Sequence, residues 1–71
     1  MLIVDRNCVI NLDNADTVFV LPYDDSTTQL RFDDCVLRFA NRAEAEHVLA
    51  DIVDAYEQRL KVYRIVRGRT A

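Results

Sequence analysis

The sequence predicts an α+β fold, a small antiparallel β-sheet of four to five strands with one C-terminal α-helix packed on one face. Before Asn41 the chain consists of short runs rich in Val, Ile, Phe, Leu and Thr, separated by turns containing Asn, Asp and Ser. From Asn41 to Leu60 apolar residues recur at helical spacing instead. With 71 residues, the chain is expected to form a single domain, residues 1–71.

The strands follow from the placement of the turns. Glycine and proline each occur once, so most turns fall to Asn, Asp and Ser, which tolerate left-handed backbone and bond their own main chain. The expected strands are Leu2–Val4, Val9–Asn11, Thr17–Leu21, Thr28–Phe32 and Val36–Phe39.

The segment from Leu30 to Phe39 predicts a β-hairpin, because the triplet Leu-Arg-Phe occurs on both sides of an Asp-Asp turn. A loop over Asp33–Val36 would place Leu30 opposite Phe39 and Phe32 opposite Leu37, forming an apolar cluster on one face. Arg31 and Arg38 would then face each other on the opposite side.

The helix has a start signal in Asn41, an N-cap residue, and Glu44, which can reach back to the Asn41 amide. Its expected apolar stripe is Ala45, Val48, Leu49, Ile52, Val53, Tyr56 and Leu60. Its expected solvent side is Glu44, His47, Asp51, Asp54 and Gln58. After the helix, residues 62–66 predict a last strand and residues 67–71 a frayed basic tail.

The run Val18-Phe19-Val20-Leu21 has apolar residues on both sides of its strand, whereas a strand with one solvated face alternates. One helix covers only one face of a sheet. Either the sheet curls enough to enclose both faces, or a second copy or a target protein covers the other. We favour a partner, contacted through Val18 and Val20 or their neighbours, and expect a homo-oligomer.

The arginines offer a second kind of contact. Arg31, Arg38 and Arg64 are expected on the uncovered face, where arginine can hold a carboxylate or phosphate through two hydrogen bonds. Tyr63 would add an aromatic anchor. The alternative is that these arginines pair with neighbouring acids on the surface. A nucleotide bound at a subunit junction, with Tyr23 or Tyr63 stacking on its base, is the second functional hypothesis.

No catalytic or cofactor pattern is present. The single histidine, His47, has Glu44 and Asp51 at helical spacing, which could support a metal or acid–base site but is more typical of a solvated helix face. The acidic pairs stand at turns, and Cys8 and Cys35 lack zinc-site spacing. We therefore expect no enzyme, no metal and no cofactor; a small hydrolase using His47 is the third hypothesis.

Charge and hydropathy limit the surroundings. A formal net charge of −3 disfavours non-specific nucleic-acid binding. No stretch approaches the roughly 20 apolar residues of a membrane helix, and the N-terminal apolar run soon reaches the charge of Asp5. We expect no membrane association, no signal peptide and a cytoplasmic protein with reduced thiols.

Three segments, Val36–Phe39, Asn41–Ile52 and Lys61–Tyr63, resemble small uncharacterised proteins of phages and their bacterial hosts. The resemblance carries no functional residue. It implies stoichiometric binding, such as inhibition of a host defence complex or capture of a nucleotide signal, in the host cytoplasm if the protein is phage-encoded. The leading hypothesis is therefore a non-enzymatic, phage-derived protein that blocks or sequesters a bacterial partner.

Overall fold

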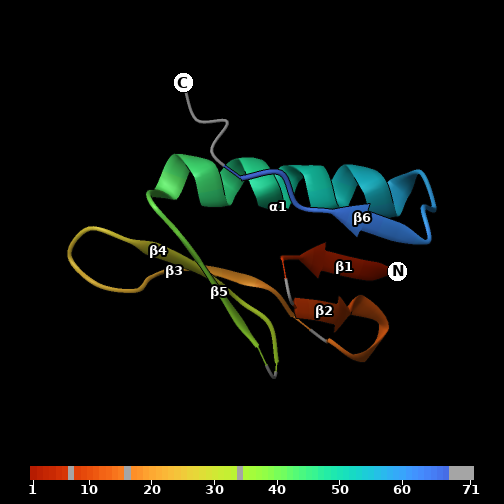
Figure 1. The fold of residues 1–71 in the computed structure, drawn as a ribbon, viewed down its shortest axis with the longest axis horizontal. Helices are drawn as coiled ribbons and strands as arrows, with labels where there is room; N and C mark the ends of the chain where they lie inside the picture. Colours follow the sequence, from red (N-terminus) through yellow and green to blue (C-terminus); the bar gives the residue numbers. More distant parts are fainter. Residues whose placement is uncertain (7, 16, 34, 68–71) are drawn as a thin grey trace.

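A computed structural model describes residues 1–6, 8–15, 17–33 and 35–67 (Figure 1). Its elements are β1 (Leu2–Asp5), β2 (Cys8–Asn11), the 3-10 helix η1 (Leu12–Asn14), β3 (Phe19–Pro22), β4 (Thr28–Arg31), β5 (Val36–Phe39), α1 (Arg42–Glu57) and β6 (Val62–Arg64). The α+β class and each expected strand are confirmed, with strand ends within two residues of the expected ones. Residues 68–71 of the expected tail and Asp34 of the expected hairpin loop lie outside the described residues.

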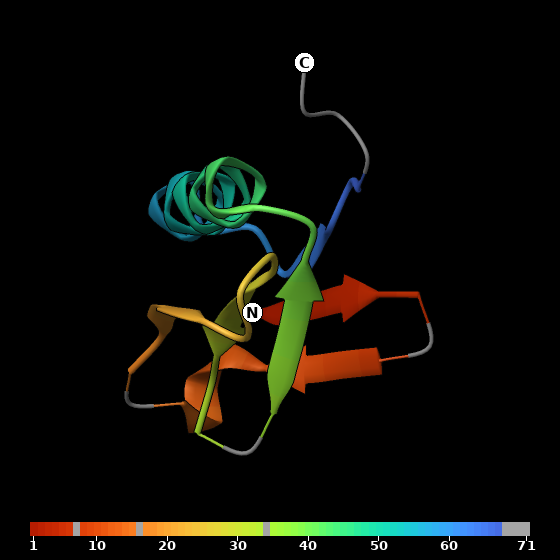
Figure 2. The ribbon, with the colours of Figure 1, turned by 90° about the vertical axis from the view of Figure 1, so that its left-hand side faces the viewer.

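The strands form two sheets, where the sequence predicted one. The first sheet has the order β2-β1-β6 and the second the order β3-β4-β5. The last strand, β6, runs parallel to β1, so the first sheet is mixed and not purely antiparallel. Figure 2 shows β5 running across the direction of β1 and β2. The β1–β2 hairpin and the β4–β5 hairpin thus face each other as two crossed layers. A single meander would not give this arrangement.

One hydrophobic core lies between the inner faces of the two sheets and the helix. Its members are Ile3 and Ile10 from the first sheet, Leu30, Phe32, Leu37 and Phe39 from the β4–β5 hairpin, and Ala45, Val48 and Ile52 from α1. The helix contacts all three strands of the second sheet. In Figures 1 and 2 it lies above β1, β2 and the second sheet, while β6 runs beside it.

The β4–β5 hairpin forms in a register two residues away from the expected one. Leu30 pairs with Leu37, and Thr28 pairs with Phe39. The Phe32 N–H donates to the Cys35 carbonyl (2.8 Å), which makes the loop tighter than predicted. A shift of two residues keeps each side chain on its face, so the expected apolar face is correct although its pairs are not.

The start of α1 is confirmed. The Glu44 N–H donates to Asn41 Oδ1 (2.9 Å), while Glu44 Oε1 accepts from the Ala40 N–H (3.3 Å) and not from the expected Asn41 amide. This bond draws the Glu44 side chain inward, so Glu44 is buried where a solvent-facing position was expected. The helix ends earlier than predicted.

At the C-terminus of α1, Arg59 takes a left-handed conformation (φ 60°) without a glycine. Its N–H donates to the Tyr56 carbonyl and the Leu60 N–H to the Ala55 carbonyl, which together form a Schellman cap. Because the chain turns here, Tyr56 and Leu60 at the end of the expected apolar stripe are exposed, as is Val53. That part of the stripe does not reach the core.

Candidate functional site

The β3–β4–β5 sheet has an open face on the side away from α1. Two rows of side chains cross it, Phe19–Arg31–Val36 and Leu21–Gln29–Arg38, and we call these residues the outer sheet face. Phe19 is 52% exposed and Val36 is 42% exposed. The alternate residues point inward and are paired as Val20–Leu30–Leu37. The sheet therefore has one face in the core and one face that α1 leaves open.

Arg31 lies on this face at the end of the central strand, β4, next to the hairpin loop. Its cross-strand neighbours are Phe19 and Val36, both apolar. Within the described part of the chain its guanidinium makes no hydrogen bond or ion pair. Together with Phe19 and Leu21, it lines a shallow hollow of about 450 Å³ at the β3 side of the sheet. Asp33 also lines this hollow. Because Arg31 itself has no hydrogen-bond or ion-pair partner among the described residues, it is available to a carboxylate from outside.

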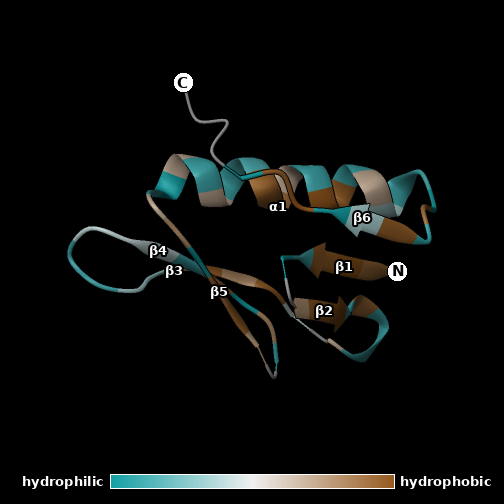
Figure 3. Ribbon diagram, viewed as in Figure 1, coloured by the Kyte–Doolittle hydropathy of each residue, from teal (hydrophilic) through white to brown (hydrophobic). Residues whose placement is uncertain are grey.

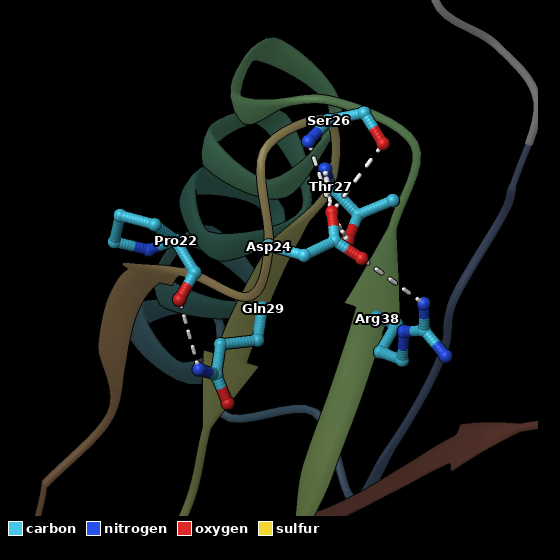
Figure 4. A network of polar contacts seen from close by, with 6 residues as sticks. All are labelled: Pro22, Asp24, Ser26, Thr27, Gln29 and Arg38. Carbon is cyan, nitrogen blue, oxygen red and sulfur yellow. Dashed lines mark hydrogen bonds and ion pairs between the residues drawn. The ribbon is translucent and has the colours of Figure 1, made fainter.

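Arg38, on the same face, already has partners. Its guanidinium lies 3.7 Å from Asp24 Oδ2 (Figure 4). It also lies 4.1 Å from the centre of the Tyr23 ring. Beside it, Gln29 Nε2 donates to the Pro22 carbonyl (3.1 Å). The alternative considered from the sequence, that an arginine pairs with a neighbouring acid, thus applies to Arg38.

Asp24 organises the β3–β4 turn. Its Oδ1 accepts from the backbone N–H groups of Ser26 (2.9 Å) and Thr27 (2.8 Å) and from the Thr27 hydroxyl (2.8 Å) (Figure 4). The Ser26 N–H, the Thr27 hydroxyl and the Thr27 N–H lower the pKa of Asp24 to about 2. The turn thereby presents Arg38 with a carboxylate that stays charged at neutral pH.

Arg64 and Tyr63 do not join this face, contrary to expectation, because β6 belongs to the other sheet. Tyr63 pairs with Ile3 on the inner side of that sheet, and its hydroxyl donates to Asp51 Oδ2 (3.2 Å). Burial raises the pKa of Tyr63. Asp51 is accordingly half-buried and not on the solvent side, and Tyr63 is not placed to stack on a bound base.

Val18 and Val20 are also placed differently from the expectation. Val20 points into the core opposite Leu30, and the open face belongs to its neighbours Phe19 and Leu21. Val18 lines a groove of about 520 Å³ between α1 and the chain around η1, together with residues such as Leu49 and Tyr56. A run of four apolar residues gives no alternation, so the sequence alone could not assign its faces.

The β2–β1–β6 sheet has an open face of its own. The paired residues Leu2, Val4, Val9 and Val62 share its outer side with Asn11 and Arg64, and we call this set the aliphatic face. Leu2, Val9 and Val62 are 40%, 60% and 42% exposed. Figure 3 shows β1 and β2 as hydrophobic over most of their length, as strands with apolar residues on both sides are.

Arg67 is the residue that sequence reasoning missed. Its Nε and Nη2 donate to Asp5 Oδ1 and Oδ2, each at 2.8 Å, and its Nη1 donates to the Arg38 carbonyl (2.6 Å). The guanidinium also lies 4.3 Å from the centre of the Phe39 ring. The Arg67 hydrogen bond lowers the pKa of Asp5. The start of the expected frayed tail is therefore tied to both sheets, and no local pattern indicated this.

We call the Arg67–Asp5 pair the clamp. Around it lies a basic corner, a hollow of about 450 Å³ whose lining includes Arg6, Arg38, Arg67 and Glu44. Its charges are balanced locally. Arg67 is held by Asp5 and Arg38 by Asp24, and Glu44 adds a third carboxylate. An entering phosphate would have to displace these carboxylates, so the corner is poorly suited to anions.

His47 is exposed on α1, and no group of three or more His, Cys, Asp or Glu side chains that could hold a metal occurs in the described ranges. Cys8 and Cys35 do meet, with their Sγ atoms 3.7 Å apart. The chain thus brings together a thiol pair and two open sheet faces, while its three candidate arginines divide between the sheets.

Comparisons of the chain with protein-family models, curated proteins and solved structures give no match. Among the described residues, no helix is long and apolar enough to cross a membrane.

Proposed function

We propose that this protein is a non-enzymatic binding protein and that its outer sheet face binds another protein. The row Phe19–Arg31–Val36 carries the proposal. It combines an aromatic ring, an aliphatic side chain and an arginine without an acidic partner on a surface that α1 leaves open. Aromatic residues and arginine supply most of the binding energy at protein interfaces, usually near the centre of the contact.

The chemistry of this row favours a partner with an apolar patch and a carboxylate. Covering Phe19 and Val36 removes apolar surface from water, at about 25 cal/mol per Å². A carboxylate can bind Arg31 without breaking an existing ion pair, unlike one that approaches Arg38. Arg31 lies between the two apolar residues, so a bound carboxylate would be shielded from water, which strengthens the charge-assisted hydrogen bonds.

The resemblance to small phage proteins supports a bacterial protein as this partner. A small chain that acts by stoichiometric binding needs an exposed contact surface and no catalytic centre. We therefore propose inhibition or sequestration of a host component, of which defence complexes are the class to test first, in the host cytoplasm.

The test compares the wild-type protein with three variants. Phe19→Glu removes the ring and places a carboxylate opposite Arg31, where the new pair helps the variant fold. Arg31→Ala removes the free guanidinium. Ala43→Glu is the control, because it adds the same charge at an exposed position in the first turn of α1, on the other side of the sheet.

Proteins captured from a bacterial extract are identified, purified and titrated against each variant by calorimetry. We expect Phe19→Glu and Arg31→Ala to weaken binding by about 30-fold or more, the loss typical of a central contact, and Ala43→Glu to leave it unchanged. A captured protein that binds all four chains equally would place its contact elsewhere and contradict the proposal.

We propose self-association through the aliphatic face, which carries four aliphatic side chains and one arginine over its two rows. Covering Leu2, Val9 and Val62 with the same face of a second copy would remove aliphatic surface from water on both chains.

The substitution Val9→Glu tests this self-association, because it introduces a charge at the most exposed of these positions. Light scattering is expected to give a multiple of the monomer mass for the wild type and for Ala43→Glu, and the monomer mass for Val9→Glu. A wild-type protein that is monomeric at the highest soluble concentration would refute self-association.

Nucleotide binding is the less favoured function, because Arg38 and Arg67 are already held by carboxylates and Arg64 lies on the other sheet. A ligand at 100 times its Kd adds about 2.7 kcal/mol of stability. Thermal-shift measurements with cyclic and linear nucleotides are therefore expected to show no stabilisation. A clear shift with one nucleotide would reverse the order of the two functions.

A further inference from the structure

The two cysteines of the chain come from different sheets and lie in contact. Cys8 begins β2 in the first sheet, and Cys35 directly precedes β5 in the second. Their Sγ atoms are 3.7 Å apart although the residues are 27 positions apart in sequence. Both side chains are half-buried, so a small reagent can reach them. Nothing in the proposed binding function uses this pair.

We propose that Cys8 and Cys35 are a dithiol site that forms a reversible disulfide by exchange with a low-molecular-weight disulfide, and so joins the two sheets covalently. A disulfide bond is about 2.05 Å long, so the sulfur atoms must approach by roughly 1.7 Å. Rotations about the two Cα–Cβ bonds can supply movements of this size.

The backbone at both positions is already fixed by the fold. Cys8 is paired with Asp5 in the β1–β2 ladder, and the Cys35 carbonyl accepts from the Phe32 N–H. The thiols are therefore brought together by the two hairpins before any bond forms. Such an arrangement favours formation of the Cys8–Cys35 disulfide within the chain over reaction of either thiol with another molecule.

The exchange balances without a further oxidant. One cysteine thiolate attacks a sulfur of the small disulfide, forming a mixed disulfide and releasing the first small thiolate. The other cysteine thiolate then attacks the protein sulfur of the mixed disulfide and releases the second small thiolate. The two protons lost by Cys8 and Cys35 are taken up by the two released thiolates. The protein thus loses two electrons, and the small disulfide gains them.

The bond would connect the two proposed binding surfaces. Cys8 is followed by Val9 of the aliphatic face, and Cys35 is followed by Val36 of the outer sheet face. Oxidation would therefore fix the position of one surface relative to the other. Cross-linking residues 27 positions apart would also restrict the unfolded chain.

The test uses the purified wild-type protein incubated with oxidised glutathione. We expect the intact mass under denaturing, non-reducing conditions to fall by two hydrogen atoms, no free thiol to remain, and the chain to run as a monomer on a non-reducing gel. We expect the Tm to rise by about 10 °C or more and dithiothreitol to reverse every change.

Cys8→Ser and Cys35→Ser are the matched controls, each retaining one thiol. With the same reagent, each is expected to stop at a stable glutathione adduct, because the resolving thiol is absent. Cys8→Ala and Cys35→Ala repeat the test if a serine hydroxyl unfolds the chain. A wild-type protein that also stops at glutathione adducts, or that forms only disulfide-linked dimers, would overturn the proposal.

Discussion

Replacing Arg67 by alanine is expected to destabilise the fold strongly. The change removes two hydrogen bonds to Asp5, one to the Arg38 carbonyl and the contact with the Phe39 ring. It also removes the ion-pair partner of the Asp5 carboxylate, whose side chain is only 8% exposed, and leaves Arg6 as a weaker positive neighbour. This last effect is the largest, because a buried charge that loses its hydrogen-bonded partner cannot recover its hydration.

The magnitude follows from the burial of the pair. Breaking a fully buried ion pair from one side costs about 3–5 kcal/mol. The Arg67 side chain is 21% exposed, so water can replace part of what is lost, and we take the free-energy loss as about 3 kcal/mol. For a domain of this size that corresponds to a fall in Tm of roughly 12–24 °C. Small domains have little stability in reserve, so a large unfolded fraction at 37 °C is within this expectation.

The assay is chemical and thermal unfolding followed by circular dichroism. Arg64→Ala is the control, since Arg64 is an exposed arginine on the neighbouring strand and its loss is expected to stay within about 0.5 kcal/mol. A double-mutant cycle with Asp5→Asn isolates the pair from the other Arg67 contacts. Equal losses for Arg67→Ala and Arg64→Ala, or no coupling in the cycle, would refute the reasoning.

The same pair predicts a pH dependence. The Arg67 hydrogen bond lowers the pKa of Asp5 below its usual value of 3.8, so the ionised form stabilises the folded state. This contribution is complete above the unfolded pKa and is lost as the pH falls through the lower, folded pKa. Wild-type stability is therefore expected to fall more steeply below about pH 4 than that of Arg67→Ala.

Three further predictions concern single polar contacts. Asn41→Ala removes the N-cap of α1 and is expected to cost about 1 kcal/mol in denaturant unfolding; an unchanged midpoint would contradict the cap. The Asp24 carboxyl carbon is expected to titrate by NMR with a midpoint of about 2, because the Ser26 N–H and the other turn donors stabilise its charge, and a midpoint near 4 would show that the turn does not hold it. Tyr63→Phe removes one hydrogen bond to Asp51 and is expected to cost about 1 kcal/mol without changing the helical signal, whereas a neutral effect would exclude that bond.

The sequence predicted what depends on neighbouring residues. The Asn41 cap and the strand positions arise from contacts within a few residues, for which spacing and turn chemistry are informative. The hairpin register was wrong by two because such a shift leaves Leu30, Leu37 and Phe39 on the same face. A hydrophobic pattern with a period of two cannot distinguish these registers.

Contacts between distant segments were not predictable in this way. The pairing of β1 with β6, the Arg67–Asp5 clamp and the Cys8–Cys35 contact each join segments that no local pattern relates. Arg67 looked like part of a basic tail because its partner is 62 positions away. The candidate site was therefore found only in part, with Arg31 and Arg38 on the open face and Arg64 elsewhere.

Apolar side chains that gather on one face indicate a contact surface, whereas isolated ones are ordinary on protein surfaces. Packing of the two sheets against each other already buries Ile10 and most of Val20, so part of the apolar surface that seemed to require a partner is covered within the chain. Phe19 and Val36 are not covered by this packing, because strand geometry places them opposite the buried residues. The proposed partners would cover these outer residues and the aliphatic face, whose Leu2, Val9 and Val62 are also exposed. Phe19→Glu could leave partner binding and self-association unchanged while Val9→Glu abolished both. The aliphatic face alone would then be the contact surface, and the outer sheet face would bind nothing.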